Sequence, residues 1–210
     1  MANNTPTGKR TFFNDEQFSD IIVKFGDKQI FAHRVTLAVG SVWFEKALCG
    51  NFSEANKKVI ELHDDASFDA IMAMLRHLYG LRYLEQELEL DERRILGFHL
   101  TVFMLGDKYD IKTLRSDAAE LFGDFLQMEE ENSENSGFWD ETIYAIQKVL
   151  GPNAPQLADQ SLAEDAQDFA IKNFELLFQD ITFRGLIAAG TMLDKDLAYR
   201  LLTKVCEKKS

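Results

Sequence analysis

Apolar and polar positions along the first 80 residues follow the period of strands in three places. Residues 20–25 (DIIVKF) are rich in β-branched and apolar side chains, the pair Gly26-Asp27 follows, and residues 28–32 (KQIFA) come next. Two such runs around a tight Gly/Asp turn predict a β-hairpin. Residues 57–62 (KKVIEL) alternate polar and apolar side chains, which predicts a third, half-buried strand.

Helical spacing dominates the remainder of the chain. Short helices are predicted over residues 33–39 and 42–48, with Gly40 ending the first and the hydroxyl of Ser41 capping the second. Longer helices are predicted over residues 68–79, 92–108, 111–128, 138–150, 160–178, 180–189 and 193–207, with Asp91 and Asp110 as caps of the second and third of these. A few short strands among helices, followed by helices alone, predict an α+β fold with an all-α extension.

Two segments interrupt these patterns and define the domain organisation. Residues 1–17 form a polar arm that we expect to be flexible, although its apolar pair Phe12-Phe13 can dock onto another surface. Residues 129–138 (EEENSENSGF) are acidic and low in complexity, as linkers are. We therefore expect a domain over residues 18–128 and a helical extension over residues 139–210. The apolar faces of the extension need burial, so we expect them to pack on the last helices of the domain.

Composition excludes several classes of protein. A chain of 210 residues buries a core without disulfide or metal staples, and Cys49 and Cys206 form no CxxC pair. The 23 basic and 35 acidic residues give a net charge of −12, so nucleic acid is not an expected direct partner. Residues 1–128 carry 15 basic and 20 acidic residues, and residues 129–210 carry 8 and 15, so the acidic excess is spread over both parts and neither part is basic. Without a signal-peptide pattern or a long apolar run, we expect a cytoplasmic or nuclear protein and no membrane partner.

The sequence contains no enzyme signature. Phosphate-binding loops, nucleophile elbows and H-E-x-x-H motifs are all missing from it. His33 as a general base has no nucleophile placed to pair with it, which favours a structural role. His63 with Asp64-Asp65 could bind a divalent ion, but the oxygen-rich loop that such ions need is missing, and a solvated turn is the alternative. The carboxylates at Glu85, Glu87, Glu89 and Asp91 could suggest acid–base chemistry, but alternate carboxylates that face water are the ordinary interpretation. We therefore predict a non-enzymatic protein without catalytic residues, cofactor or metal.

An ordered series of short strings between Phe18 and Met128 resembles the BTB/POZ domain. The strings are FSDIIV (18–23), IFAHR (30–34), LAVGS (37–41), FSE (52–54), VIEL (59–62), LRHLYG (75–80) and LGDKYDIKTL (105–114), with Phe44 and Phe68 between them. The resemblance implies a small β-sheet flanked by helical hairpins. It marks Asp20, His33, Ser41, Tyr79 and Tyr109 as fold-signature residues. The extension is similar in a loose way to the helices that follow this domain in fungal-type, stand-alone and adaptor-type members.

The resemblance implies a protein–protein interaction module. In adaptor-type members, a hydrophobic–x–acidic triplet contacts the cullin-3 scaffold of a ubiquitin ligase, which here implies partner binding by Phe52 and Glu54. An exposed apolar anchor beside a charge suits that task. The alternative is that Phe52 packs on its own helix and Glu54 is solvated. A second class of function is a transcription- or chromatin-associated scaffold that acts through a DNA-binding partner.

The oligomeric state depends on the segment before Phe18. Many family members dimerise by exchanging an amphipathic helix at this place. Residues 5–17 (TPTGKRTFFNDEQ) contain Pro6 and Gly8 and lack apolar residues at helical spacing. We therefore expect a monomer, or a weak dimer that uses another surface.

Overall fold

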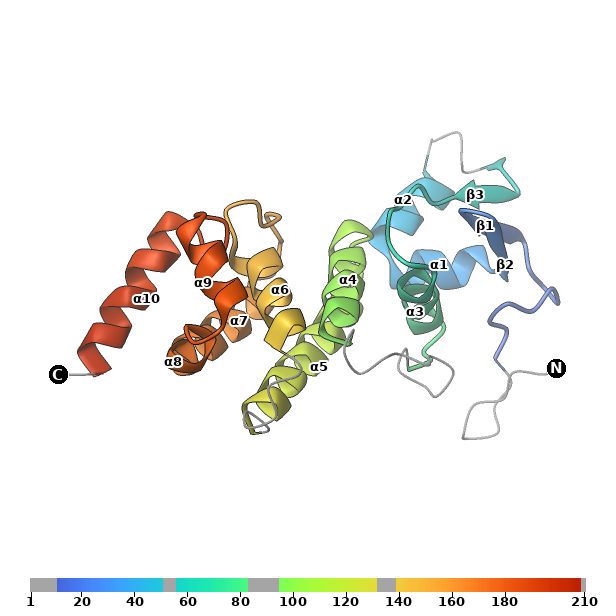
Figure 1. The fold of residues 1–210 in the computed structure, drawn as a ribbon. Helices are drawn as coiled ribbons and strands as arrows, with labels where there is room; N and C mark the ends of the chain where they lie inside the picture. The colour runs from blue at the N-terminus through green and yellow to red at the C-terminus, as the bar shows by residue number, and fades with distance from the viewer. Residues whose placement is uncertain (1–10, 51–55, 83–94, 132–138, 209–210) are drawn as a thin grey trace. The chain divides into compact units, whose positions relative to one another are not determined.

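The computed structural model describes residues 11–50, 56–82, 95–131 and 139–208 (Figure 1). The chain forms two compact units, the first from residues 1–89 and 101–115 and the second from residues 90–100 and 116–210. Two helices, α4 (Ile95–Lys108) and α5 (Lys112–Glu131), contribute to both units. The division therefore cuts across these helices, whereas the sequence had suggested a boundary in the acidic segment at 129–138.

A three-stranded sheet forms one side of the first unit. Strands β1 (Ile21–Phe25) and β2 (Lys28–Ala32) pair antiparallel, while β3 (Val59–Glu61) pairs parallel with β1, giving the order β2-β1-β3. The hairpin turn contains Gly26 at φ 57°, a backbone conformation that glycine adopts without a steric cost. Ile21, Val23 and Phe25 alternate into the core, as the period of a half-buried strand requires.

Short helices complete the first unit. They are α1 (Arg34–Gly40), α2 (Val42–Cys49) and α3 (Phe68–Leu78), joined by the second half of α4 and the first turn of α5. The predicted serine cap is confirmed, because Ser41 Oγ accepts the amide of Phe44 at 3.1 Å. Ser67 caps α3 in the same way, accepting the amide of Ala70 at 3.3 Å. These caps satisfy donors that a helix start leaves free.

The second unit is helical in the residues that the structure describes. Besides parts of α4 and α5 it contains α6 (Trp139–Leu150), α7 (Ser161–Lys172), α8 (Phe174–Leu177), α9 (Ile181–Ala188) and α10 (Lys195–Lys208). Glu141 of α6 accepts the amide of Gly97 in α4 at 2.9 Å, and Lys172 of α7 binds Glu130 of α5 at 2.7 Å. The expected packing of the extension on the last helices of the preceding domain is therefore found.

The α+β class with a helical extension is confirmed, but four local predictions need correction. The helix predicted over residues 160–178 is broken at Asn173, and α5 extends to Glu131, into the predicted linker. Asp110 does not cap α5; it follows α4 with a left-handed φ of 48°. Residues 11–17 are not a free arm, because Phe13 is buried against Tyr79 and Asn14 accepts the amide of Phe31. The predicted cap Asp91 lies outside the described residues.

Membrane-spanning helices were sought within the described part of the chain. Across these residues, no helix combines the length and the apolar character that a membrane crossing demands.

Candidate partner-binding groove

The first hydrogen-bonded cluster of signature residues joins β2, α1 and α3. His33 Nε2 lies 3.1 Å from the carbonyl oxygen of Gln17, so this nitrogen carries the proton. His33 Nδ1 then accepts the Tyr79 hydroxyl at 2.8 Å, while the hydroxyl oxygen accepts the His33 amide at 2.9 Å. Burial raises the pKa of Tyr79 to about 12. The ring of His33 is thus committed to structure and not to general-base chemistry.

Asp20, and not His33, caps the start of α1. The side chain of His33 makes no capping bond to α1. Instead, Asp20 Oδ1 accepts the amide of Arg34, the first residue of α1, at 2.8 Å. A carboxylate near a helix N-terminus also interacts favourably with the helix dipole.

The second cluster surrounds Tyr109, at the end of α4. Ser41 Oγ donates to the carbonyl oxygen of Tyr109 at 2.6 Å, in addition to capping α2. The Tyr109 hydroxyl donates to Asp64 at 3.4 Å, and Lys108 binds the same carboxylate at 2.7 Å. Burial and the nearby Asp64 charge raise the pKa of Tyr109. Asp64 also accepts the amide of Ala66, so its side chain closes a short loop over residues 64–66.

Tyr109 places Trp43 at the surface of the first unit. The Trp43 ring lies edge-on to Tyr109 with centroids 4.9 Å apart, and edge-on to Phe44 at 5.0 Å. These contacts leave 36% of Trp43 exposed. A large amphipathic ring fixed by its neighbours loses little conformational entropy when a partner covers it.

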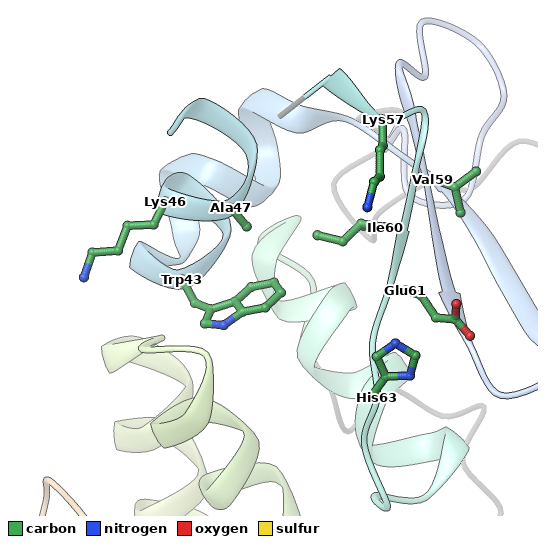
Figure 2. Close-up of a pocket in the computed structure, with 8 residues that line it drawn as sticks. All are labelled: Trp43, Lys46, Ala47, Lys57, Val59, Ile60, Glu61 and His63. Carbon is green, nitrogen blue, oxygen red and sulfur yellow. The ribbon is translucent and has the colours of Figure 1, made fainter. Parts of the chain in front are cut away.

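The exposed side of Trp43 opens into a groove of about 720 Å³ between α2 and β3. Figure 2 shows Trp43 and Ala47 on the α2 side facing Ile60 on the strand side, while Val59 and Glu61 point away from α2. Lys46, Lys57 and His63 complete the lining. The groove therefore combines an apolar floor with two exposed lysines, on a protein whose net charge is −12.

Arg34 connects the two walls of this groove. Its guanidinium donates to the carbonyl oxygen of Leu48 in α2 at 3.5 Å and to that of Lys57 ahead of β3. These two carbonyls flank the segment that contains Phe52 and Glu54. The predicted anchor residues themselves lie outside the described residues, so their contacts stay a prediction. Arg34 thus joins the end of α2 to the residue ahead of β3.

The groove lining includes residues that the sequence analysis did not single out. Trp43, Lys46 and Lys57 sit in unremarkable local patterns, and only the folding of α2 beside β3 brings them together. The exposed tryptophan in a short amphipathic helix was the available signal. In the part of the chain that the structure describes, no three His, Cys, Asp or Glu side chains gather as a metal would need.

Comparison with known proteins identifies the family. The family profile described as BTB/POZ domain matches residues 10–121, more than half of the chain. The chain belongs to the BTB/POZ family. The matched region begins at residue 10 and so includes Phe13. The burial of Phe13 agrees with its belonging to the domain.

Two of the similar proteins match part of this chain. The BTB and MATH domain-containing protein 42 of Caenorhabditis elegans is 28% identical over 122 residues, which are 57% of this chain and 27% of that protein. The chain thus matches about a quarter of the length of this relative. The solved BTB domain of zebrafish PATZ1 is 19% identical and covers 51% of this chain and 77% of its own, with a TM-score of 0.37. The BTB/POZ domain at residues 10–121 is a protein–protein interaction module.

Proposed function

We propose that this BTB/POZ protein is a substrate adaptor of a cullin-3 ubiquitin ligase. In this proposal, cullin-3 binds the groove between α2 and β3 together with the segment that carries Phe52 and Glu54. The second unit then recruits the target protein. The role is non-catalytic, because an adaptor only brings the target to the ligase.

One observation carries the proposal. The groove with its half-exposed Trp43 borders both ends of the segment in which the hydrophobic–x–acidic triplet lies. An aromatic anchor next to a desolvated apolar groove is the usual composition of a binding hot spot. The triplet and the groove would then form one continuous contact surface.

Calorimetric titration of the purified N-terminal region of cullin-3 tests this proposal. For Phe52→Ala we expect a loss of about 1–3 kcal/mol, which corresponds to an affinity roughly 5- to 150-fold weaker. Val39→Ala is the control, because this α1 side chain is 84% exposed and outside the groove. The control should bind like the wild type.

The titration distinguishes the cullin-3 adaptor role from the general role of an interaction module. Equal affinity of Phe52→Ala and wild type would contradict binding through the triplet. No binding by either protein would exclude the cullin-3 adaptor role, while the interaction module as such would remain. Circular dichroism of each variant confirms that the fold is intact.

A further inference from the structure

The strand β3 forms one edge of the sheet and uses only one side of its main chain. The amide of Ile22 donates to Lys58, and that of Leu62 donates to Lys24, both at 2.8 Å. Peptide groups in a strand alternate in direction, so those of Val59 and Glu61 point away from β1. Within the described chain, no residue hydrogen-bonds to the main chain of Val59 or Glu61.

Positively charged side chains occupy both flanks of this open edge. The guanidinium of Arg34 donates to the carbonyl oxygen of Lys57, and Lys108 Nζ donates to that of His63 at 3.3 Å. By the same alternation, the main-chain groups of residues 57, 59, 61 and 63 all point away from β1. The flanking carbonyls are therefore satisfied within the chain, whereas the groups of Val59 and Glu61 between them are not.

The groove beside Trp43 lies along this edge. Val59, Ile60 and Glu61 all belong to its lining, opposite Trp43 and Ala47 of α2 (Figure 2). A strand added to β3 would direct alternate side chains toward the groove and away from it. Its inward side chain would meet the apolar floor, and a neighbouring acidic side chain would lie on the strand side of the groove, near Lys57 (Figure 2).

We propose that the edge of β3 binds an extended segment of a partner protein as an added strand. The segment presents one apolar side chain to Trp43 and carries an acidic residue beside Lys57. Main-chain pairing supplies affinity and the groove supplies specificity, as in other cases of strand addition. This inference rests on the proposed interaction function and specifies its binding mode, and it holds whether or not cullin-3 is a partner.

A peptide selection tests the added strand directly. Random 12-residue peptides displayed on phage are selected on the full chain, and the enriched peptides are titrated by fluorescence anisotropy. We expect apolar–acidic sequences to be enriched. Glu61→Pro should weaken their binding by about tenfold or more, because proline removes the outward N–H while the bonds to β1 remain. The matched variant Glu61→Ala keeps the N–H and should bind within about twofold of wild type.

Two further measurements keep the outcome decisive. If Glu61→Pro does not fold, peptides N-methylated at alternate residues replace it, and only one of the two alternating sets should lose binding. Amide exchange at Val59 and Glu61 should slow when peptide binds. No enriched peptide, equal binding to both Glu61 variants, or protection confined to other elements would overturn the proposal. Because no cullin-3 is used, these outcomes are independent of the adaptor titration.

Discussion

At the scale of single residues, Ser41 does more than its sequence pattern predicts. Its hydroxyl accepts the Phe44 amide at the start of α2 and donates to the carbonyl oxygen of Tyr109, 68 positions later in the chain. The cap is a local property that a short motif predicts. The bond to Tyr109 is a tertiary contact and needs the folded chain to be seen.

The two bonds of Ser41 give a stability prediction. Ser41→Ala should lower the free energy of unfolding by about 2–3 kcal/mol, since it removes a cap and leaves a buried carbonyl without its donor. Ser67→Ala is the matched control, because Ser67 only caps its helix, and about 1 kcal/mol is expected. Urea denaturation of both variants provides the comparison. Equal losses would contradict the structural role of the Ser41–Tyr109 bond.

His99 gives a second prediction at this scale, on the pH dependence of stability. It is buried in α4, with its ring 5.4 Å from that of Phe125, and burial lowers its pKa to about 4. The unfolded chain therefore binds the proton more strongly, with a pKa of about 6.5. The stability that neutral His99 provides is present above pH 6.5 and is lost as the pH falls toward 4.

Urea denaturation at pH 7 and pH 5 measures this contribution. From pH 7 to pH 5, the free energy of unfolding of wild type should fall by about 2 kcal/mol more than that of His99→Phe. In this variant an apolar ring replaces the titrating ring. The difference between the two proteins isolates His99 from the other titrating groups. Parallel pH profiles would show that His99 is not responsible.

At the scale of elements, the spacing of apolar residues predicted most helices and strands but not the break at Asn173. Apolar residues continue across it, so the pattern indicates one helix. The Asn173 side chain donates to the carbonyl oxygen of Phe169 at 3.1 Å, and the helix ends there. Asparagine competes for main-chain groups in this way, which a count of apolar positions does not register.

The packing of Phe13 could also not be predicted from the spacing of apolar residues. A single apolar pair in a polar segment has no period, and the sequence allowed only that it could dock. In the structure the Phe13 ring meets Tyr79 edge-on at 5.4 Å and lies under the guanidinium of Arg76. The sequence singled out the signature residues through a family resemblance, whereas Trp43 and the open edge of β3 follow only from the tertiary fold.

Helices α6 and α7 provide the element-scale prediction. They are tied to the preceding helices by Glu141–Gly97 and Lys172–Glu130 contacts, and they belong to the same compact unit as residues 90–100 and 116–131. A specific protease site placed within residues 132–138 should therefore yield two fragments that co-elute on gel filtration. Separate elution of two stable fragments would contradict this packing.

At the scale of the whole molecule, the two units carry very different charge. The first unit holds 13 basic and 15 acidic residues, and the second holds 10 and 20. Both units carry an acidic excess, and most of it lies in the second unit. Acidic crowding is visible locally, since burial and the carboxylates of Asp168 and Glu164 raise the pKa of Asp165. A target recruited by the second unit is expected to present a basic surface.

The oligomeric state is a prediction at the same scale. The segment before Phe18 lacks the apolar period of an exchanged helix, and Phe13 within it is buried in its own chain. Multi-angle light scattering at micromolar concentration should give a mass near 24.0 kDa. A mass of twice that value at this concentration would contradict the prediction.

The groove between α2 and β3 is the proposed partner-binding surface of this BTB/POZ protein. Methyl resonances of Ala47 and Ile60, and the indole of Trp43, report on that groove directly. Titration with the N-terminal region of cullin-3 should shift these three signals at the same protein ratio, while the Val39 methyls on α1 stay unchanged. Binding that moves Val39 or signals of the second unit, and leaves Trp43, Ala47 and Ile60 in place, would contradict the claim.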